Sequence, residues 1–164
     1  MNIKRSGFVA GAIAVAGLLA SAALAEKGEI GPTVIEFTQT GCQFLESEGG
    51  VDHGYMPMTA KDCKTINAQT GDERLNKSEV LTLKPGKYLF RVSNQDVPYE
   101  PGFWLREHDH DWRNPLHKVG KISVSGGGLT RGKINEYEVE LKPGEYLYSC
   151  PLNPTPNYRI KVEG

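Results

Sequence analysis

The chain has 164 residues, of which 38% are hydrophobic, and its 19 Lys and Arg residues nearly balance its 20 Asp and Glu residues. The formal net charge of −1 excludes nucleic-acid binding through a basic surface, because no cationic field is available to displace counterions from phosphate. The length predicts one domain, since a single core organises about 100–200 residues.

The first 25 residues have the features of a secretory signal peptide. Lys4 and Arg5 supply the charged start, Phe8–Ala20 the apolar stretch, and Ala23-Leu24-Ala25 a cleavage site with small residues at its first and third positions. The alternative is an uncleaved anchor, but the apolar stretch is shorter than the roughly 20 residues that span a bilayer. We therefore expect one exported domain over residues 26–164, periplasmic or secreted, that does not itself span a membrane.

The three cysteines, Cys42, Cys63 and Cys150, are then expected in an oxidising compartment, where disulfides form and persist. Cys42 and Cys63 both belong to the turn-rich first third of the exported chain, and we expect them to pair. Cys150 ends a strand-like segment and would be the unpaired thiol. It is either an inert packing residue or a reactive or metal-bound group, and a mixed disulfide formed during export is a further alternative.

Apolar and polar residues alternate through most of the remaining chain, which predicts short β-strands in a sandwich or barrel. The expected strands are Thr33–Thr38, Val80–Leu83, Tyr88–Val92, Ile122–Val124, Tyr137–Leu141, Tyr146–Tyr148 and Tyr158–Val162. One helical excursion is expected over Thr59–Ala68. Thr59 and Asp62 form a capping-box pattern at its start, and Gly71 lies just past its expected end.

A short sequence occurs twice and predicts two turns. Leu83–Phe90 reads Leu-Lys-Pro-Gly-Lys-Tyr-Leu-Phe, and Leu141–Tyr148 reads Leu-Lys-Pro-Gly-Glu-Tyr-Leu-Tyr. Pro presets the first corner of a tight turn and Gly accepts the positive φ of a type II turn, so each copy predicts a turn between two strands. Because the flanking sequences differ, we interpret the repetition as a favoured turn rather than a duplication.

The second copy lies in a region that resembles a known family. Glu138–Pro151, a proline-rich loop and the closing strand Tyr158–Val162 are similar to the C-terminal end of a cupredoxin. Tyr88–Asp96 followed by Phe103–Leu105 resembles the family's strand, asparagine-containing turn and next strand. The resemblance implies an all-β Greek-key sandwich of about seven or eight strands, of the kind found with periplasmic copper and iron handling systems.

The resemblance also implies a copper ligand at Cys150, which occupies the position of the family's ligand cysteine. A blue-copper site needs two imidazoles and a thiolate, usually with a weak axial thioether. In the family one His follows the asparagine turn, where this chain has Glu100, and the second His and the Met follow the Cys. No His or Met occurs after His117, so a standard blue-copper centre is not expected.

Two other clusters offer metal ligands. His108 and His110 stand at alternate positions with His117 nearby, and copper(II), nickel and zinc all accept such imidazoles. The alternative is a polar surface loop.

The second cluster contains His53, Met56 and Met58, where thioethers suit copper(I) outside the cytoplasm. The alternative is that one Met fills a gap in the core while the other is exposed.

Aromatic and proline residues are expected to gather at one end of the sandwich, where family members meet ligands and redox partners. The candidates are Tyr99, Phe103, Trp104, Pro151, Pro154 and Tyr158. They would form either a docking surface or a hydrophobic lid.

No catalytic motif is present that would predict an enzyme. The first functional hypothesis is a periplasmic metal-handling accessory, with copper as the expected ion. The second is a metal-free, cupredoxin-derived module that docks on a membrane transporter or redox complex. The third is an electron-transfer copper protein with non-standard ligands.

Overall fold

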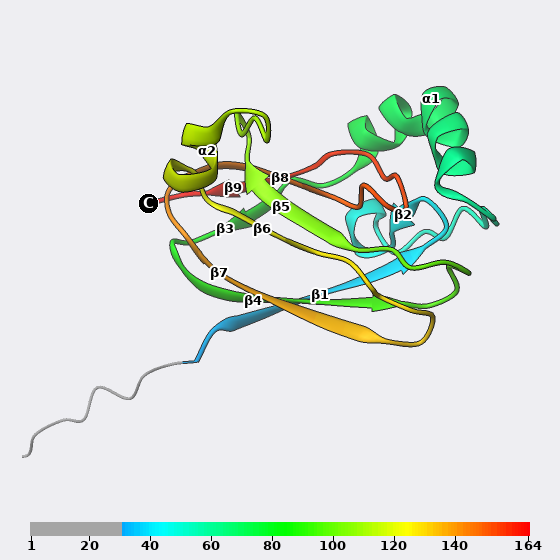
Figure 1. Ribbon diagram of the computed structural model, residues 1–164, viewed down its shortest axis with the longest axis horizontal. Coiled ribbons are helices and arrows are strands. Elements are labelled where there is room, and N and C mark those ends of the chain that lie inside the picture. The colour runs from blue at the N-terminus through cyan, green and yellow to red at the C-terminus, as the bar shows by residue number, and fades with distance from the viewer. Residues whose placement is uncertain (1–30) are drawn as a thin grey trace, which may run out of the picture. The chain divides into compact units, whose positions relative to one another are not determined.

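The computed structural model describes residues 31–164 (Figure 1). The expected signal peptide lies outside the described residues. Two β-sheets hold most of the regular secondary structure in these residues, and their strands follow one another in an order that passes repeatedly from one sheet to the other. The predicted all-β Greek-key sandwich is therefore confirmed. None of the helices in residues 31–164 is long and apolar enough to cross a membrane.

The first sheet has the strand order β2-β1-β4-β7, and the second has the order β3-β9-β8-β5-β6. The strands of the first sheet are β1 (Thr33–Thr40), β2 (Gln43–Phe44), β4 (Gly86–Asn94) and β7 (Ile134–Leu141). Those of the second are β3 (Leu81–Leu83), β5 (Phe103–Glu107), β6 (Ser123–Gly126), β8 (Gly144–Ser149) and β9 (Tyr158–Val162). Each contains most or all of the strand expected at that place, and only the two-residue β2 was not foreseen.

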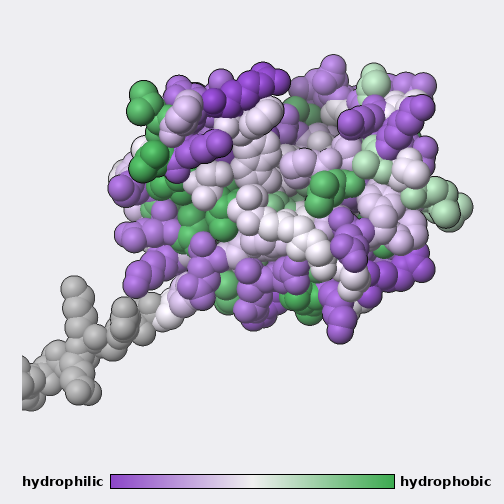
Figure 2. Space-filling view, viewed as in Figure 1, coloured by the Kyte–Doolittle hydropathy of each residue, from purple (hydrophilic) through white to green (hydrophobic). Residues whose placement is uncertain are grey.

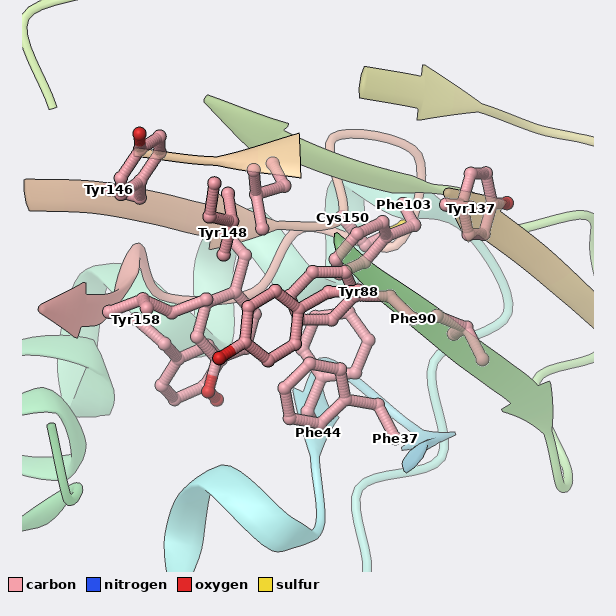
Figure 3. Packing of buried hydrophobic residues seen from close by; sticks show 14 of the residues in the cluster. Phe37, Phe44, Tyr88, Phe90, Phe103, Tyr137, Tyr146, Tyr148, Cys150 and Tyr158 are labelled. Carbon is pink, nitrogen blue, oxygen red and sulfur yellow. The ribbon is translucent and has the colours of Figure 1, made fainter. Parts of the chain in front are cut away.

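The alternation of apolar and polar residues places one face of each sheet in a shared aromatic core (Figure 3). In β9, for example, every second residue from Tyr158 to Val162 is buried. The ring centroids of Phe37 and Tyr148, from opposite sheets, lie 4.7 Å apart, and those of Phe90 and Phe103 lie 5.6 Å apart. The core is thus built across the two sheets, and it surrounds the start of the loop that follows β8.

Both Lys-Pro-Gly segments link a strand of one sheet to a strand of the other. Gly86 begins β4 with a φ of 158°, and Gly144 begins β8 with a φ of 154°. A type II turn requires a φ of about +80° at this position, so the predicted turn type is wrong. The two segments are nearly extended crossings between sheets, and both lie at the same end of the sandwich beside Val162.

Helix α1 (Ala60–Lys77) is longer than the expected helix, although it begins where the sequence indicates. The capping box between Thr59 and Asp62 is present, with both reciprocal bonds formed. The predicted end at Ala68 is wrong, because the helix continues to Lys77 and buries Gly71 and Arg74. Since α1 otherwise buries only Cys63, it is attached to the sandwich by a disulfide and polar contacts rather than by an apolar stripe.

Two shorter elements were not foreseen. A 3-10 helix, η1 (Glu46–Glu48), follows β2, and helix α2 (Pro115–Gly120) lies between β5 and β6 in a region expected to be a turn. The side chain of Asn114 caps α2 by accepting a hydrogen bond from the backbone N–H of Leu116, and Pro115 occupies the first turn. The sequence Asn-Pro is thus a helix start here.

Candidate functional site

Cys150 lies at the end of β8, where it closes the aromatic core beside Phe103 (Figure 3). It is 1% exposed and is the free cysteine of residues 31–164. Its sulfur accepts hydrogen bonds from the backbone N–H of Gly102 at 3.2 Å and of Asn153 at 3.0 Å. Two loops, one before β5 and one after β8, therefore hold the thiol from both sides.

Burial raises the pKa of the Cys150 thiol, and the backbone N–H groups that would favour a thiolate offset this effect only in part. The group is therefore protonated at neutral pH. A reactive or metal-binding cysteine needs an electropositive and partly open setting, which this enclosed position does not provide.

Asn153 stands three residues after Cys150, in the loop where the resembled family places its second His. Its Oδ1 accepts hydrogen bonds from the backbone N–H of Cys42 at 3.1 Å and the hydroxyl of Tyr99 at 2.9 Å. Its Nδ2 donates to Gln39 Oε1 at 3.2 Å and to the carbonyl of Thr40 at 3.0 Å. All the polar atoms of this buried side chain are satisfied by the protein itself.

Gln39 completes the network around the thiol. It is fully buried near the C-terminal end of β1, and its Nε2 donates to the carbonyl of Gly102 at 2.6 Å. The neighbours of the Cys150 sulfur are thus joined to one another through Gln39 and Asn153. Neither residue was singled out from the sequence, although a glutamine two positions after the core residue Phe37 on a strand is a readable signal of a buried polar group.

The predicted disulfide between Cys42 and Cys63 is confirmed, with the two Cα atoms 5.1 Å apart. Both residues are fully buried. The Cys63 sulfur lies 3.1 Å from Asn153 Oδ1, which is a packing contact because a disulfide sulfur carries no hydrogen. The disulfide therefore fastens the start of α1 beside the Cys150 loop.

The residues at this end of the sandwich do not fit a blue-copper centre. The hydrogen bonds to the Cys150 sulfur come from the backbone N–H groups of Gly102 and Asn153, whereas such a centre requires two imidazoles. Glu100, which takes the place of the first His, is exposed. A blue-copper centre therefore lacks its imidazole ligands here, and the thiol is buried and protonated.

His108, His110 and His117 lie at the opposite end of β5 from Cys150. The pairing of β5 with β8 sets Trp104 opposite Ser149 and Glu107 opposite Tyr146. Cys150 is therefore level with Phe103, and at about 3.3 Å per residue the five steps from Phe103 to His108 span about 16 Å. The thiol and these histidines therefore cannot share one ion.

Within the histidine cluster, the ring centroids of His110 and His117 lie 6.1 Å apart. The backbone N–H of Asp111 donates to His117 Nδ1 at 2.9 Å, so the lone pair of that nitrogen is engaged in a hydrogen bond and is not free to bind a metal ion. The Nδ1 of His110 is buried and has no hydrogen-bond partner. In residues 31–164, no group of three or more His, Cys, Asp or Glu side chains is arranged to hold a metal ion.

In the second predicted cluster, His53 contacts neighbouring side chains while the two methionines are exposed to solvent. His53 Nε2 lies 2.7 Å from Glu48 Oε2, and its ring stacks on Tyr55 with centroids 5.5 Å apart. Met56 is 90% exposed and Met58 is 73% exposed. The alternative that one methionine packs into the core is therefore wrong.

Some of the predicted docking residues are buried in the core, and the others are at least partly accessible. Phe103 and Tyr158 are core residues, 1% and 0% exposed, and cannot face a partner, because their positions on β5 and β9 point inward. Tyr99 and Trp104 are half-buried, and Arg106 stacks on the Trp104 ring at 3.9 Å. Pro151 is exposed, and half-buried Pro154 accepts a hydrogen bond from the Asn67 side chain through its carbonyl.

A buried ion pair that the sequence did not indicate lies beside His53. Arg74 Nη2 is 2.7 Å from Glu48 Oε1, and both side chains are at most 5% exposed. The hydroxyl of Tyr158 donates to the same carboxylate. Glu48 and Arg74 line a pocket of about 440 Å³ together with His53 and Tyr55. No local pattern predicts this pair, because Glu48 and Arg74 are far apart in the chain and meet only through the fold.

Replacing Cys150 with Ser is expected to lower the free energy of unfolding by about 1–3 kcal/mol, because the shorter side chain loses packing and reaches the two N–H donors less well. Addition of copper(II) to the unaltered protein is expected to give no intense visible sulfur-to-copper band. Denaturant unfolding and absorption spectroscopy check the two statements. An intense band that disappears in Cys150→Ser would show that the thiol binds copper(II), contrary to its burial and protonation.

No protein-family model matches the chain, and no curated protein matches it. Solved structures do. Auracyanin B is 12% identical with a TM-score of 0.50, over 82% of this chain and 92% of that one. The reduced auracyanin of Roseiflexus castenholzii is 11% identical with a TM-score of 0.47, over 82% of this chain and 100% of that one. Auracyanin A of Chloroflexus aurantiacus, described as a "blue" copper protein, is 16% identical with a TM-score of 0.43, over 81% of this chain and 100% of that one.

At identities this low the similarity bears on the fold alone. The two-sheet topology of residues 31–164 agrees with that similarity. The described part of the chain is a cupredoxin-like β-sandwich.

Proposed function

We propose that this protein is an exported accessory of copper handling that binds copper(I) through Met56 and Met58 and not through Cys150. The observation that carries the proposal is the exposure of both thioethers, 90% and 73%, since methionine is among the residue types most often fully buried. The disulfide between Cys42 and Cys63 supports export, because such bonds persist in oxidising compartments.

The loop that carries the two methionines is firmly held. Pro57, between them, is buried, so the side chains of Met56 and Met58 emerge on the solvent side of the loop. Pro57 and Tyr55 pack against Gly41 so closely that a Cβ there would lie 2.1 Å from the Tyr55 carbonyl oxygen. The backbone N–H of Met58 donates to Asp62 Oδ2 at 2.9 Å. The two thioethers are therefore presented from a fixed backbone.

The chemistry of these side chains suits copper(I). A thioether is a soft, neutral ligand that needs no deprotonation, and soft sulfur ligands select copper(I). His53 is engaged with Glu48, so this chain would supply two thioethers and leave the remaining coordination positions open. An exposed site with few ligands from its own chain favours transfer of the ion to a periplasmic or membrane protein partner over storage.

The proposal is tested by anaerobic competition of the protein with a chromophoric copper(I) chelator. We expect one equivalent of copper(I) to be held by the unaltered protein, and the affinity to fall at least about tenfold in the double variant Met56→Leu/Met58→Leu. Leu is close to Met in volume and leaves the loop packing unchanged. Cys150→Ser is the matched control and is expected to bind copper(I) as the unaltered protein does.

A second function, that of a metal-free module docking on a membrane transporter or redox complex, is favoured by the enclosure of Cys150 in its amide network. In that case the exposed methionines would be contact residues, since flexible thioether side chains adapt to varied partners. The same titration separates the two functions. Copper(I) affinity that is weak and equal in the unaltered and double-variant proteins would reject the copper proposal and favour the docking module.

A further inference from the structure

Helix α2 presents its apolar residues to solvent. Leu116 is 77% exposed and Val119 is 88% exposed, and their three-residue spacing places them on one face of the helix. His117, between them, is half-buried and turned toward the preceding loop, where its Nδ1 accepts the Asp111 N–H. A surface helix normally turns its apolar face to the core, so α2 has the reverse orientation.

Trp112 extends this apolar surface just before the helix begins. It is 58% exposed, and the guanidinium of Arg113 lies 4.9 Å from its ring centroid. Figure 1 shows α2 standing outside the sandwich, and Figure 2 shows hydrophobic side chains gathered at that corner of the molecule. We name Trp112, Leu116 and Val119 the α2 tip. Single exposed apolar residues are ordinary, but a group on one projecting segment marks an interaction site.

The α2 tip is presented by a well-fastened segment. The Asn114 side chain caps α2, and the Lys121 ammonium lies 2.6 Å from Asp109 and 3.4 Å from Glu107. The backbone N–H of His108 donates to the carbonyl of Glu145 on β8 at 2.8 Å. The apolar side chains are therefore held outward by the fold and are not the product of a frayed loop.

Basic residues accompany the α2 tip. Arg113 and Lys118 are exposed in the segment itself, whose acids are Asp109, paired with Lys121, and Asp111. The two Lys-Pro-Gly segments that cross between the sheets bring further exposed lysines to the same end of the sandwich. These are Lys84 and Lys142. The recurring Lys-Pro-Gly sequence thus contributes two cations, and one anion at exposed Glu145, to the end of the molecule that carries the α2 tip.

We propose that the α2 tip docks this protein on the surface of an anionic lipid bilayer. Three apolar side chains are too few for a stable protein interface, which needs about 800 Å² from each partner. They suit shallow insertion at the boundary between headgroups and acyl chains, where Trp is favoured and flanking Arg and Lys meet anionic headgroups. Docking at this end leaves the methionine loop, which packs on Gly41 at the opposite end, facing away from the bilayer.

The test is co-sedimentation of the exported protein with vesicles of phosphatidylglycerol and phosphatidylcholine in equal parts, and with vesicles of phosphatidylcholine alone. We expect binding to the anionic vesicles that weakens by at least about tenfold in Leu116→Gln/Val119→Gln and by about fivefold in Lys118→Gln. Ile134→Gln is the matched control, because Ile134 is an exposed apolar residue, 57% accessible, on β7. It is expected to bind as the unaltered protein does.

Three outcomes would overturn the proposal. The first is an absence of binding to anionic vesicles. The second is binding that Ile134→Gln weakens as much as the change at Leu116 and Val119 does, because the contact would then not be specific to the tip. The third is self-association of the unaltered protein that Leu116→Gln/Val119→Gln abolishes while vesicle binding stays unchanged, which would assign the surface to a second copy of the chain.

Discussion

Replacing Arg74 with Met is expected to lower the free energy of unfolding by about 3–5 kcal/mol, because the change leaves the buried Glu48 carboxylate without its cation. Arg74 also donates to the Cys42 carbonyl at 3.0 Å and to Asn67 Oδ1 at 2.8 Å, so the change removes much of what attaches α1. Denaturant unfolding at neutral pH measures the loss.

The double variant Glu48→Gln/Arg74→Met is the control for this prediction. It removes both charges, so it is expected to lose less stability than Arg74→Met alone, as is found when a buried pair is replaced as a unit. A double variant less stable than the single one would show that lost packing, and not the unpaired charge, dominates.

The same pair predicts a dependence on pH. Burial alone would raise the pKa of Glu48, but hydrogen bonds from Arg74 and Tyr158 and the Arg74 charge outweigh it and hold the pKa below its ordinary value of 4.5. A carboxylate with a lowered folded-state pKa stabilises the fold above that ordinary value, and the contribution is lost as the pH falls through the folded pKa. The stability difference between the unaltered protein and Arg74→Met should therefore narrow below about pH 4.5, and a constant difference would contradict this assignment.

Removing the disulfide with Cys42→Ser/Cys63→Ser is the second change with a large expected effect. The bond closes a loop with a sequence separation of 21, for which chain entropy gives about 3 kcal/mol. Because α1 buries little besides Cys63, Gly71 and Arg74, the loss should be greatest in that helix. Hydrogen exchange should show loss of protection in α1 before the sheets, whereas a uniform loss would contradict an attachment that depends on the disulfide.

The strands were predictable because apolar and polar residues alternate along a half-buried strand, as they do in Tyr158–Val162. The length of α1 was not, because its anchors are Cys63 and Arg74 rather than an apolar stripe with a helical period. Gly71 therefore indicated the end of a helix, although it lies buried inside α1.

The candidate site was predictable only in part. Cys150 stood out through its similarity to a family ligand, and the exposed pair Met56 and Met58 through its short spacing. The amide network could not be foreseen, because Asn153 and Gln39 are 114 residues apart and meet only through the strand order of two sheets. The Cys150 thiol is thus enclosed by contacts that no local sequence pattern predicts.

We propose that Met56 and Met58 bind copper(I) while the Cys150 thiol stays enclosed and protonated. Carbon-13 NMR of the methionine methyl groups and of the Cys150 β-carbon, recorded during anaerobic addition of copper(I), tests this proposal. We expect the methyl resonances of Met56 and Met58 to shift and to reach their limit at one equivalent, with the Cys150 β-carbon unchanged. A shifted Cys150 β-carbon with unmoved methionine methyl groups would contradict it.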